Sequence, residues 1–264
     1  VSLMRKYCID YTNSHDQSLY DEFMRPDYVV HSFGRDLPRD TFYARGVEAI
    51  FGIAPGLGLV VHEFVLNGDR LAMHFSEHAA LPAGDGRALA CWRGIGLYQW
   101  DGQRLVENWV EQDYFAMQRQ MRTGRPDPLK PPHLDPWVWT EPVPADDSAT
   151  TTVRKWIDGG DLAAADRVEI DDTRAGLPYE PCLEIDEIVV DDIFSAGATV
   201  PFHVTYHGRY RGGLRDQYAK LVGQKTTMGV AGIARVENGA VGEVSAVTCK
   251  VQAIGGLTGR LDIF

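Results

Sequence analysis

Acidic residues gather in one stretch of the chain, where carboxylates could serve as general acids or bases. The stretch covers residues 104–117, RLVENWVEQDYFAM, and follows an Asp-Gly dipeptide typical of a β-hairpin turn. Alternate residues of a strand share a face, so three acids lie on the side of Trp109: Glu107, Glu111 and Asp113. Because this pattern is unusual on a core strand, we expect the face to line a cavity that uses a carboxylate.

Asp113 is the acid that we expect to transfer protons. An aspartate in water has a pKa of about 3.9, and burial beside Trp109 would raise that pKa toward neutrality, where the carboxylate is a better base. Repulsion by Glu107 and Glu111 would raise the pKa further. The alternative is structural: Asp113 is then a solvated carboxylate at the end of the strand, or the cap of a helix over residues 114–121.

Three histidines are candidate catalytic partners of Asp113: His31, His74 and His78. His74 and His78 are four residues apart, a spacing that holds one metal ion in a helix. Their segment reads as a strand, where such positions are roughly 13 Å apart, too far for ligand bonds of about 2 Å. We therefore predict no metal site, and a histidine that polarises a substrate oxygen or exchanges a proton. The alternative is that they are ordinary half-buried strand histidines.

Four further side chains are candidates for binding the substrate: Tyr28, Tyr43, Trp109 and Arg93. A tyrosine hydroxyl can donate a hydrogen bond to a developing oxyanion. Arg93 lies in the strand that precedes the Asp113 strand, and an ion pair with Glu107 or Asp113 would lower the aspartate pKa. For Arg93 we expect such a structural ion pair rather than a contact to the substrate.

Sequence motifs for other chemistries are missing. Gly94-x-Gly96 lacks the third glycine and the helix of a dinucleotide site, and the chain has no Gly-x-Ser-x-Gly nucleophile motif. We therefore expect that the protein works without a cofactor.

Hydrophobic periodicity predicts helices first and a meander of strands afterwards. Helical spacing covers residues 3–23 with a break at 13–16, a strand covers 28–33, a loop 34–40 and a helix 46–52. Four long strands separated by Gly-Asp or Asp-Gly turns follow, over residues 59–67, 70–81, 88–100 and 104–114. This order predicts an α+β fold in which a curved antiparallel sheet wraps around helices as a cone or half-barrel.

The second half of the chain repeats the first. Residues 73–78 and 202–207 both contain His-x-x-x-His, and Glu107 corresponds to Glu243, which aligns Asp113 with Cys249. We therefore predict two tandem domains, residues 1–122 and 148–264, that stack as a pseudo-dimer. The linker between them, residues 123–147, contains seven of the 14 prolines. Because Cys249 is no carboxylate, the second domain is either a degenerate scaffold or holds a different site.

These pieces together resemble one known family, the SnoaL-like polyketide cyclases of the nuclear-transport-factor-two-like superfamily. The pieces are Asp27-Tyr-Val-Val-His31, Pro55-Gly56, Gly68-Asp69-Arg70, Asp101-Gly102 and Val106-Glu107-x-Trp109-x-x-x-Asp113. The resemblance covers residues 1–122 and, more weakly, 148–264. It implies a deep apolar pocket between the sheet and its helices, and it implies that Asp113 is the acid/base residue.

Composition narrows the classes of partner. The net charge of −11 disfavours nucleic acids and anionic membranes, and no apolar run is long enough to span a bilayer. The first residues lack the apolar core of a secretory signal, and four cysteines without paired spacing predict reduced thiols. We therefore expect a cytoplasmic protein.

Function is expected to rest on acid/base chemistry. We predict a cofactor-independent lyase or isomerase that acts by elimination, dehydration, retro-aldol or aldol chemistry on a small, apolar, oxygenated substrate of aromatic or polyketide type. A homo-oligomer built on the pseudo-dimer would fit the tandem domains. The contrasting hypothesis is a non-catalytic module for small-molecule binding or assembly. A lesser alternative, an epoxide hydrolase, is disfavoured because His74, Ser76 and His78 stand where an Arg-x-Asp pair is needed.

Overall fold

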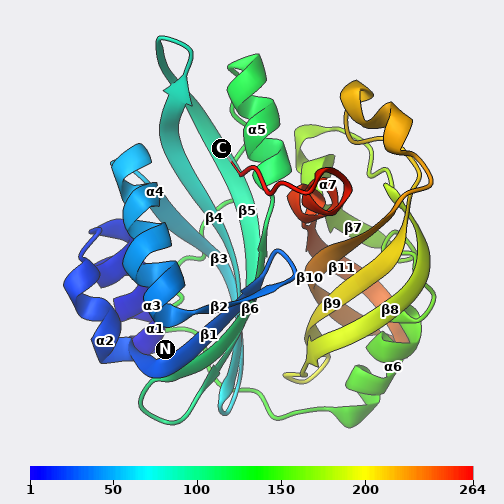
Figure 1. Cartoon of the computed structure of the whole chain (residues 1–264). Coiled ribbons are helices and arrows are strands. Elements are labelled where there is room, and N and C mark those ends of the chain that lie inside the picture. The colour runs from blue at the N-terminus through cyan, green and yellow to red at the C-terminus, as the bar shows by residue number, and fades with distance from the viewer. Residues whose placement is uncertain (264) are drawn as a thin grey trace.

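The chain forms two β-sheets that lie against each other, each with helices on its outer face (Figure 1). Figure 1 is a computed structural model of the protein, and it describes residues 1–263 apart from the side chains of residues 42–44, 172 and 174. We call the first sheet with its helices the N-terminal domain and the second sheet with its helices the C-terminal domain. None of the described helices is long and apolar enough to cross a membrane.

The N-terminal domain contains a six-stranded sheet in the order β2-β1-β6-β5-β4-β3. The strands are β1 (Met24–Ser32), β2 (Arg35–Pro38), β3 (Gly58–Asn67), β4 (Arg70–Ala83), β5 (Gly86–Trp100) and β6 (Leu105–Gln112). The helical segments are α1 (Ser2–Arg5), η1 (Lys6–Asn13), η2 (Gln17–Leu19), α2 (Tyr20–Phe23), α3 (Arg39–Thr41), η3 (Phe42–Val47), α4 (Glu48–Ile53) and α5 (Tyr114–Thr123). β1 runs parallel to β6, and the other neighbouring strands are antiparallel.

The C-terminal domain repeats this topology with five strands in the order β7-β11-β10-β9-β8. The strands are β7 (Arg167–Ile170), β8 (Leu183–Ile193), β9 (Thr199–Tyr210), β10 (Lys225–Glu237) and β11 (Ala240–Thr248). The helical segments are α6 (Asp147–Ile157), η4 (Asp171–Ala175), η5 (Asp216–Leu221) and α7 (Lys250–Thr258). Here β7 runs parallel to β11, as β1 does to β6. The predicted fold class, two tandem α+β half-barrels, is therefore confirmed.

The predicted correspondence between Asp113 and Cys249 is also confirmed. Asp113 precedes α5 with φ −80° and ψ 64°, and Cys249 precedes α7 with φ −82° and ψ 67°. The Asp113 N–H donates to the backbone oxygen of Arg93 in β5 at 2.8 Å, and the Cys249 N–H donates to that of Gly229 in β10, also at 2.8 Å. One predicted loop, residues 34–40, instead contains the short edge strand β2, which pairs with β1.

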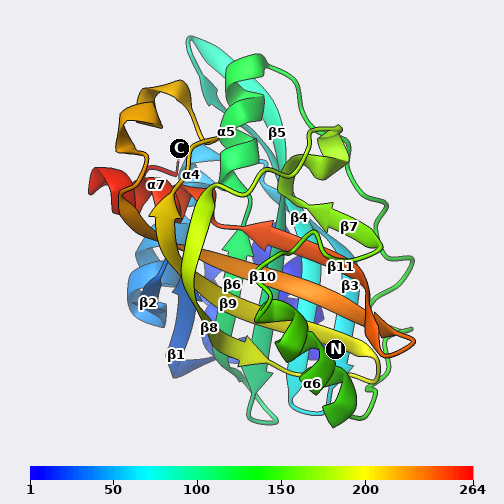
Figure 2. The same ribbon diagram turned by 90° about the vertical axis from the view of Figure 1, so that its right-hand side faces the viewer.

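The two domains pack sheet against sheet, as the two views in Figures 1 and 2 show. A buried apolar cluster joins them, made of Val65, Ala72, Ile95 and Leu97 from one sheet side and Phe194, Ala196, Ala231, Ile233 and Val247 from the other. Ion pairs between Arg70 and Asp192 and between Glu63 and Arg235 lie beside this cluster. Each sheet therefore has one face covered by helices and the other covered by the second sheet.

The proline-rich segment after α5 runs along the edge of the first sheet. The N–H groups of His133 and Val143 donate to backbone oxygens of β3 at 2.8 and 2.9 Å. The Trp137 ring meets the Phe64 ring edge-on, with centroids 5.4 Å apart. These contacts cover the open edge of β3, which would otherwise expose unpaired backbone groups.

Candidate functional site

A cavity of about 70 Å³ lies between the helices of the N-terminal domain and the face of the sheet that they cover. We call it the N-terminal cavity. That volume holds a few water molecules. Most of its wall is aromatic or aliphatic, with rings from Tyr7, Tyr11, Phe33, Phe51, Phe75, Tyr98 and Tyr114.

Glu77 is the one carboxylate among the described residues that line this cavity. It lies in β4 opposite Trp92 of β5. Its neighbours on the same face of β4 are apolar and buried: Leu71, Met73, Phe75, Ala79 and Leu81. Burial raises the pKa of Glu77 from 4.5 to about 7, although a hydrogen bond from Trp92 opposes the shift. Both the acid and the carboxylate are therefore populated near neutral pH.

Two amide side chains of β6 share the cavity with Glu77. The Trp92 indole N–H donates to Gln112 Oε1 at 2.8 Å, which fixes both groups beside the glutamate. Asn108 is 1% exposed, and its Oδ1 has no hydrogen-bond partner among the described residues. A buried amide left this way can hydrogen-bond an oxygenated ligand. Together these groups can transfer a proton and hold a polar substituent inside an apolar wall.

The predicted cavity face of β6 is wrong. The residues of β6 that line the cavity are Asn108, Val110 and Gln112, the alternation opposite to the predicted one. The predicted face instead points to the C-terminal domain, where Trp109 packs on the interdomain cluster and Glu111 meets His203 at 3.2 Å. Both faces of this central strand are buried, so burial of polar residues alone did not distinguish them.

Asp113 sits at the start of α5 rather than on the cavity wall. It is 2% exposed, and its Oδ1 accepts from the Ala116 N–H at 2.9 Å as the cap of the helix. Its other neighbours border a space of about 20 Å³ between the domains, where Arg93 and Asp171 also lie. That space holds about one water molecule. The structure therefore favours the capping alternative for the position of Asp113.

We expected a structural ion pair of Arg93 with Glu107 or Asp113, and the structure shows one with a carboxylate of the C-terminal domain. Its guanidinium lies 3.2 Å from Glu169 of β7. It also donates from Nε to His74 Nε2 at 3.3 Å and from Nη1 to the backbone oxygen of Asp171 at 3.4 Å. Arg93 and His74 therefore connect the domains and lie away from the N-terminal cavity.

The two histidines of β4 are on the face that turns away from Glu77. His74 is completely buried beside the His62 ring, at 5.4 Å between centroids. The His78 ring lies against Gly58, where a Cβ atom would be 2.8 Å from it. Neither histidine lines the N-terminal cavity among the described residues, because period two places them opposite Glu77.

His31 and Trp109 form a separate group on the face of the first sheet that turns toward the C-terminal domain. Their rings stack at 3.9 Å between centroids. The two ring nitrogens of His31 meet Asp36 Oδ1 at 2.7 Å and Glu107 Oε1 at 2.8 Å. With both nitrogens engaged, His31 supports the sheet, and it lies on the opposite face of β1 from Val30 and Ser32, which line the cavity.

The two predicted tyrosines have different outcomes. Tyr28 is completely buried in the core of the N-terminal domain and is not among the described residues that line the cavity. The side chain of Tyr43 lies outside the described part of the chain. The tyrosines that do line the cavity, Tyr7, Tyr11, Tyr98 and Tyr114, were not singled out from the sequence.

A second group of buried charges joins the two domains. His203 Nδ1 lies 2.8 Å from Asp191, and its Nε2 lies 3.2 Å from Glu111 of β6. Burial lowers the pKa of His203, but hydrogen bonds to Asp191 and Glu111 outweigh that effect and raise it to about 9. Gly229 makes room for this contact, since a Cβ atom there would collide with the Glu111 carboxylate.

Sequence reasoning missed Glu77, although β4 carries a signal for it. Along one face of β4 every second residue from Leu71 to Leu81 is apolar except Glu77. A single acid in such a row must either be buried or break the strand, and burial raises its pKa. The His-x-x-x-His pattern on the opposite face drew the prediction to the wrong side.

No protein-family model matches the chain, and no curated protein matches it significantly. Solved structures with a similar fold include a candidate polyketide cyclase from Acidithiobacillus ferrooxidans. It is 18% identical with a TM-score of 0.40, and the match covers 47% of this chain and 94% of that one. IdmH from Streptomyces antibioticus, also a candidate polyketide cyclase, is 21% identical with TM-score 0.40, covering 46% of this chain and 96% of its own.

A third similar structure is a candidate SnoaL-like polyketide cyclase from Shewanella denitrificans. It is 16% identical with TM-score 0.41 and covers 46% of this chain and 96% of its own length. Each of these proteins therefore matches about the length of one domain.

Proposed function

We propose that the N-terminal domain is a cofactor-independent acid/base enzyme, a lyase or isomerase, in which Glu77 transfers the proton. The observation that supports this most is a single carboxyl group in an aromatic cavity with its pKa raised to about 7. A group with a pKa near the working pH can both accept and return a proton, which is what this chemistry requires.

The proposed step begins with ionised Glu77. Its carboxylate takes a proton from a carbon next to a carbonyl group, and the electron pair of that C–H bond forms an enolate. A tyrosine hydroxyl of the wall donates to the enolate oxygen and stabilises it, while Asn108 Oδ1 can accept a hydrogen bond from a hydroxyl group of the substrate. Protonated Glu77 then returns the proton to another carbon in an isomerisation, or to a leaving hydroxyl in an elimination.

The proposed substrate is small, largely apolar and oxygenated. The cavity of about 70 Å³ admits only a few heavy atoms with its side chains in place. A larger aromatic or polyketide-like molecule would need rings such as Phe51 and Tyr114 to move. The aromatic wall suits such a molecule, and the polar groups at Glu77, Asn108 and Gln112 would bind its oxygen atoms.

The small volume of the cavity also favours a second candidate function, a non-catalytic binding or assembly module. In that case the aromatic rings are core packing, and Glu77 is a buried acid that stays protonated. The two candidates differ in whether a ligand is converted after it binds.

The test is a screen of small β-hydroxy ketones, enols and aromatic ketones for proton exchange with solvent deuterium and for elimination, followed by NMR. We expect exchange or elimination by the wild type and its loss in Glu77→Gln, while Asp113→Asn retains it. Conversion that survives Glu77→Gln and is lost in Asp113→Asn would move the role back to Asp113. Binding without conversion would favour the module.

A further inference from the structure

The C-terminal domain has a cavity at the place that matches the N-terminal cavity, and it is far larger. Its volume is about 630 Å³. It opens between the turn that follows α6, residues 158–161, the start of β8, and the helix-covered face of β9 and β10. We call it the C-terminal cavity. The sequence left open whether this domain holds a site of its own.

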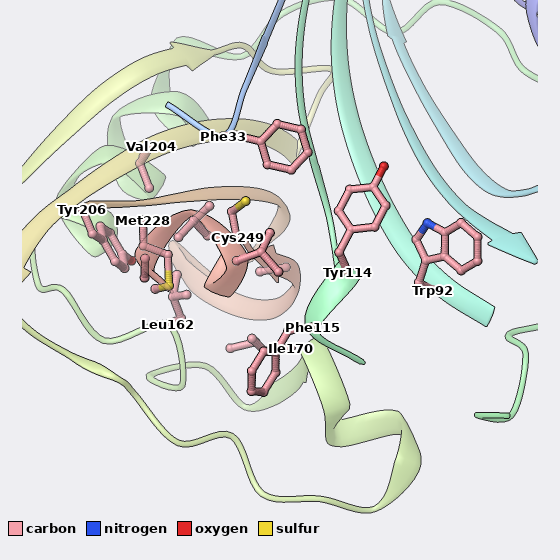
Figure 3. Packing of buried hydrophobic residues seen from close by; sticks show 14 of the residues in the cluster. Phe33, Trp92, Tyr114, Phe115, Leu162, Ile170, Val204, Tyr206, Met228 and Cys249 are labelled. Atoms are coloured by element: carbon pink, nitrogen blue, oxygen red, sulfur yellow. The ribbon is translucent and has the colours of Figure 1, made fainter. Parts of the chain in front are cut away.

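The register of the two sheets identifies the residue that replaces Glu77. Glu77 pairs with Trp92 in the first sheet, and Tyr206 pairs with Met228 in the second. The residue after Trp92 is Arg93, whose backbone oxygen accepts from the N–H of Asp113 before α5. The residue after Met228 is Gly229, whose backbone oxygen accepts from the N–H of Cys249 before α7. Tyr206 therefore stands where Glu77 does, and Figure 3 shows it beside Met228.

Tyr206 presents a free hydroxyl to this cavity. The residue is 2% exposed and lines the cavity floor. Its hydroxyl has no hydrogen-bond partner among the described residues, in contrast to Tyr210, whose hydroxyl accepts from the Leu214 N–H at 3.2 Å. Burial and the nearby Asp161 carboxylate raise the pKa of Tyr206, so the hydroxyl stays neutral and can serve as donor or acceptor.

The wall of the C-terminal cavity is strongly acidic. Its carboxylates are Asp158, Asp161, Glu184, Asp186 and Glu187, against the single guanidinium of Arg211 among the described lining residues. Asp186 lies 4.0 Å from Arg209, and the other four have no ion-pair partner within the described chain. Such a lining concentrates cations at the mouth of the cavity and repels anions.

The deeper part of the wall is apolar or aromatic. Ile185, Ile188, Met228 and the ring of Tyr179 line it together with Tyr206. Burial, and after it the Asp161 carboxylate, raise the pKa of the Tyr206 hydroxyl; Asp161 has only the smallest of several effects on Tyr179, after burial and Asp171. A carboxylate beside aromatic rings is the arrangement that binds an organic ammonium group, by charge and by cation–π attraction.

We propose that the C-terminal cavity binds an organic ammonium ion with an apolar body. The ammonium group lies between the Asp161 carboxylate and the Tyr206 hydroxyl, and the body packs on Ile188 and Met228. This binding does not depend on the acid/base role of Glu77, because the two cavities are on different sheets.

The test uses benzylamine as the probe and the full chain as the protein. Titration is followed by amide NMR, with benzyl alcohol and benzoate as the neutral and anionic counterparts of the same size. We expect benzylamine to shift the amides of residues 158–161 and 183–188 and to bind at least tenfold more tightly than benzyl alcohol. Raising the salt concentration should weaken the binding of benzylamine alone.

Two variants with a matched control complete the test. Asp161→Asn should weaken benzylamine binding about five- to tenfold, and Tyr206→Phe about threefold, since one net hydrogen bond is lost. Glu77→Gln, at the matching position of the other domain, should leave it unchanged. Equal binding of benzylamine and benzyl alcohol, shifts confined to the N-terminal domain, or no effect of Asp161→Asn would each overturn the proposal.

Discussion

The two domains share one topology but differ in the cavity between sheet and helices. The N-terminal cavity is small, about 70 Å³, and its aromatic wall encloses one acid, Glu77. The C-terminal cavity is open, about 630 Å³, with acids around a tyrosine, Tyr206, at the matching position. The two copies of the fold therefore place their acids in different surroundings. In the N-terminal domain burial raises the pKa of the acid toward 7, and in the C-terminal domain the acids are exposed to water.

This difference shows that the environment of a carboxyl group determines its chemistry. Asp158, Asp161, Glu184 and Glu187 are exposed to water, and their side by side arrangement around one cavity attracts cations. Glu77 lies among aromatic rings, and burial there raises its pKa to about 7. The first arrangement suits binding of a positive ligand, and the second suits proton transfer.

Removing the acid from the N-terminal cavity should have the largest effect. We expect Glu77→Gln to lower the rate of a proton-transfer reaction at least hundredfold, because a positioned general base contributes about 10² to 10⁴. The measurement is the initial rate of solvent deuterium exchange into a substrate found by the screen. A loss of less than tenfold would contradict the role of Glu77.

The stability of the same variant provides a control for folding. The folded pKa of Glu77, about 7, is above its ordinary value of 4.5, so the free energy of unfolding of the wild type falls as pH rises between these values. Glu77→Gln does not titrate. It should therefore gain stability relative to the wild type from pH 5 to pH 8, as thermal unfolding at both values would measure.

Removing the charged histidine between the domains, His203, should have the next largest effect. His203→Ala removes the cation that faces the buried carboxylate of Glu111 and the partly buried carboxylate of Asp191, which should cost about 3 kcal/mol of unfolding free energy. The His203 pKa is raised from 6.5 to about 9, so its stabilisation is complete below pH 6.5 and lost as pH rises through 9.

Urea unfolding of wild type and His203→Ala across that pH range measures both effects. The difference between the two proteins should shrink above pH 9. A constant difference at all pH values would mean that packing, and not the charge of His203, holds the domains together. Arg70→Ala, which removes a less buried interdomain ion pair, should change stability much less.

A smaller effect is expected at the two matching helix caps. Asp113→Ala removes the side-chain cap of α5 and should lower the unfolding free energy by about 1 kcal/mol or more. Cys249→Ala removes no cap, because the Cys249 side chain accepts no hydrogen bond from the first N–H groups of α7. Chemical denaturation of both variants measures the difference, and equal losses would contradict the capping role of Asp113.

The smallest effect should be a shift in the titration of Glu77. The Trp92 indole lowers the Glu77 pKa against the effect of burial. Trp92→Phe removes this donor and keeps an aromatic ring, so the Glu77 pKa should move above 7. The pH dependence of the exchange rate measures it, and a shift to lower pH would contradict the account.

Much of the fold could be predicted from the sequence. Turns such as Gly68-Asp69 and Asp101-Gly102 separate the long strands, and the repeat that pairs Asp113 with Cys249 predicts the two domains. These signals are local or depend on comparing the chain with itself. They need no knowledge of which surface each sheet covers.

The candidate site could not be predicted because it depends on that knowledge. On β6, Glu111 and Gln112 are both polar, and one meets the other domain while the other lines the cavity. Period two predicts that they lie on opposite faces, but a sheet covered on both sides gives no apolar-in, polar-out contrast. Of the site residues, only Glu77 can be recognised in the sequence, because it is the one acid in a row of apolar residues on one face of β4.

The proposed function depends on Glu77 being a half-buried acid whose pKa is raised to about 7. Its pKa can be measured directly by titrating the side-chain carboxyl carbon in ¹³C-glutamate-labelled protein, with Glu77→Gln to assign the signal. We predict a midpoint near 7, in agreement with burial among aromatic rings. A midpoint near the ordinary value of about 4.3 would mean that water solvates this carboxylate, and it would contradict the proposed proton transfer.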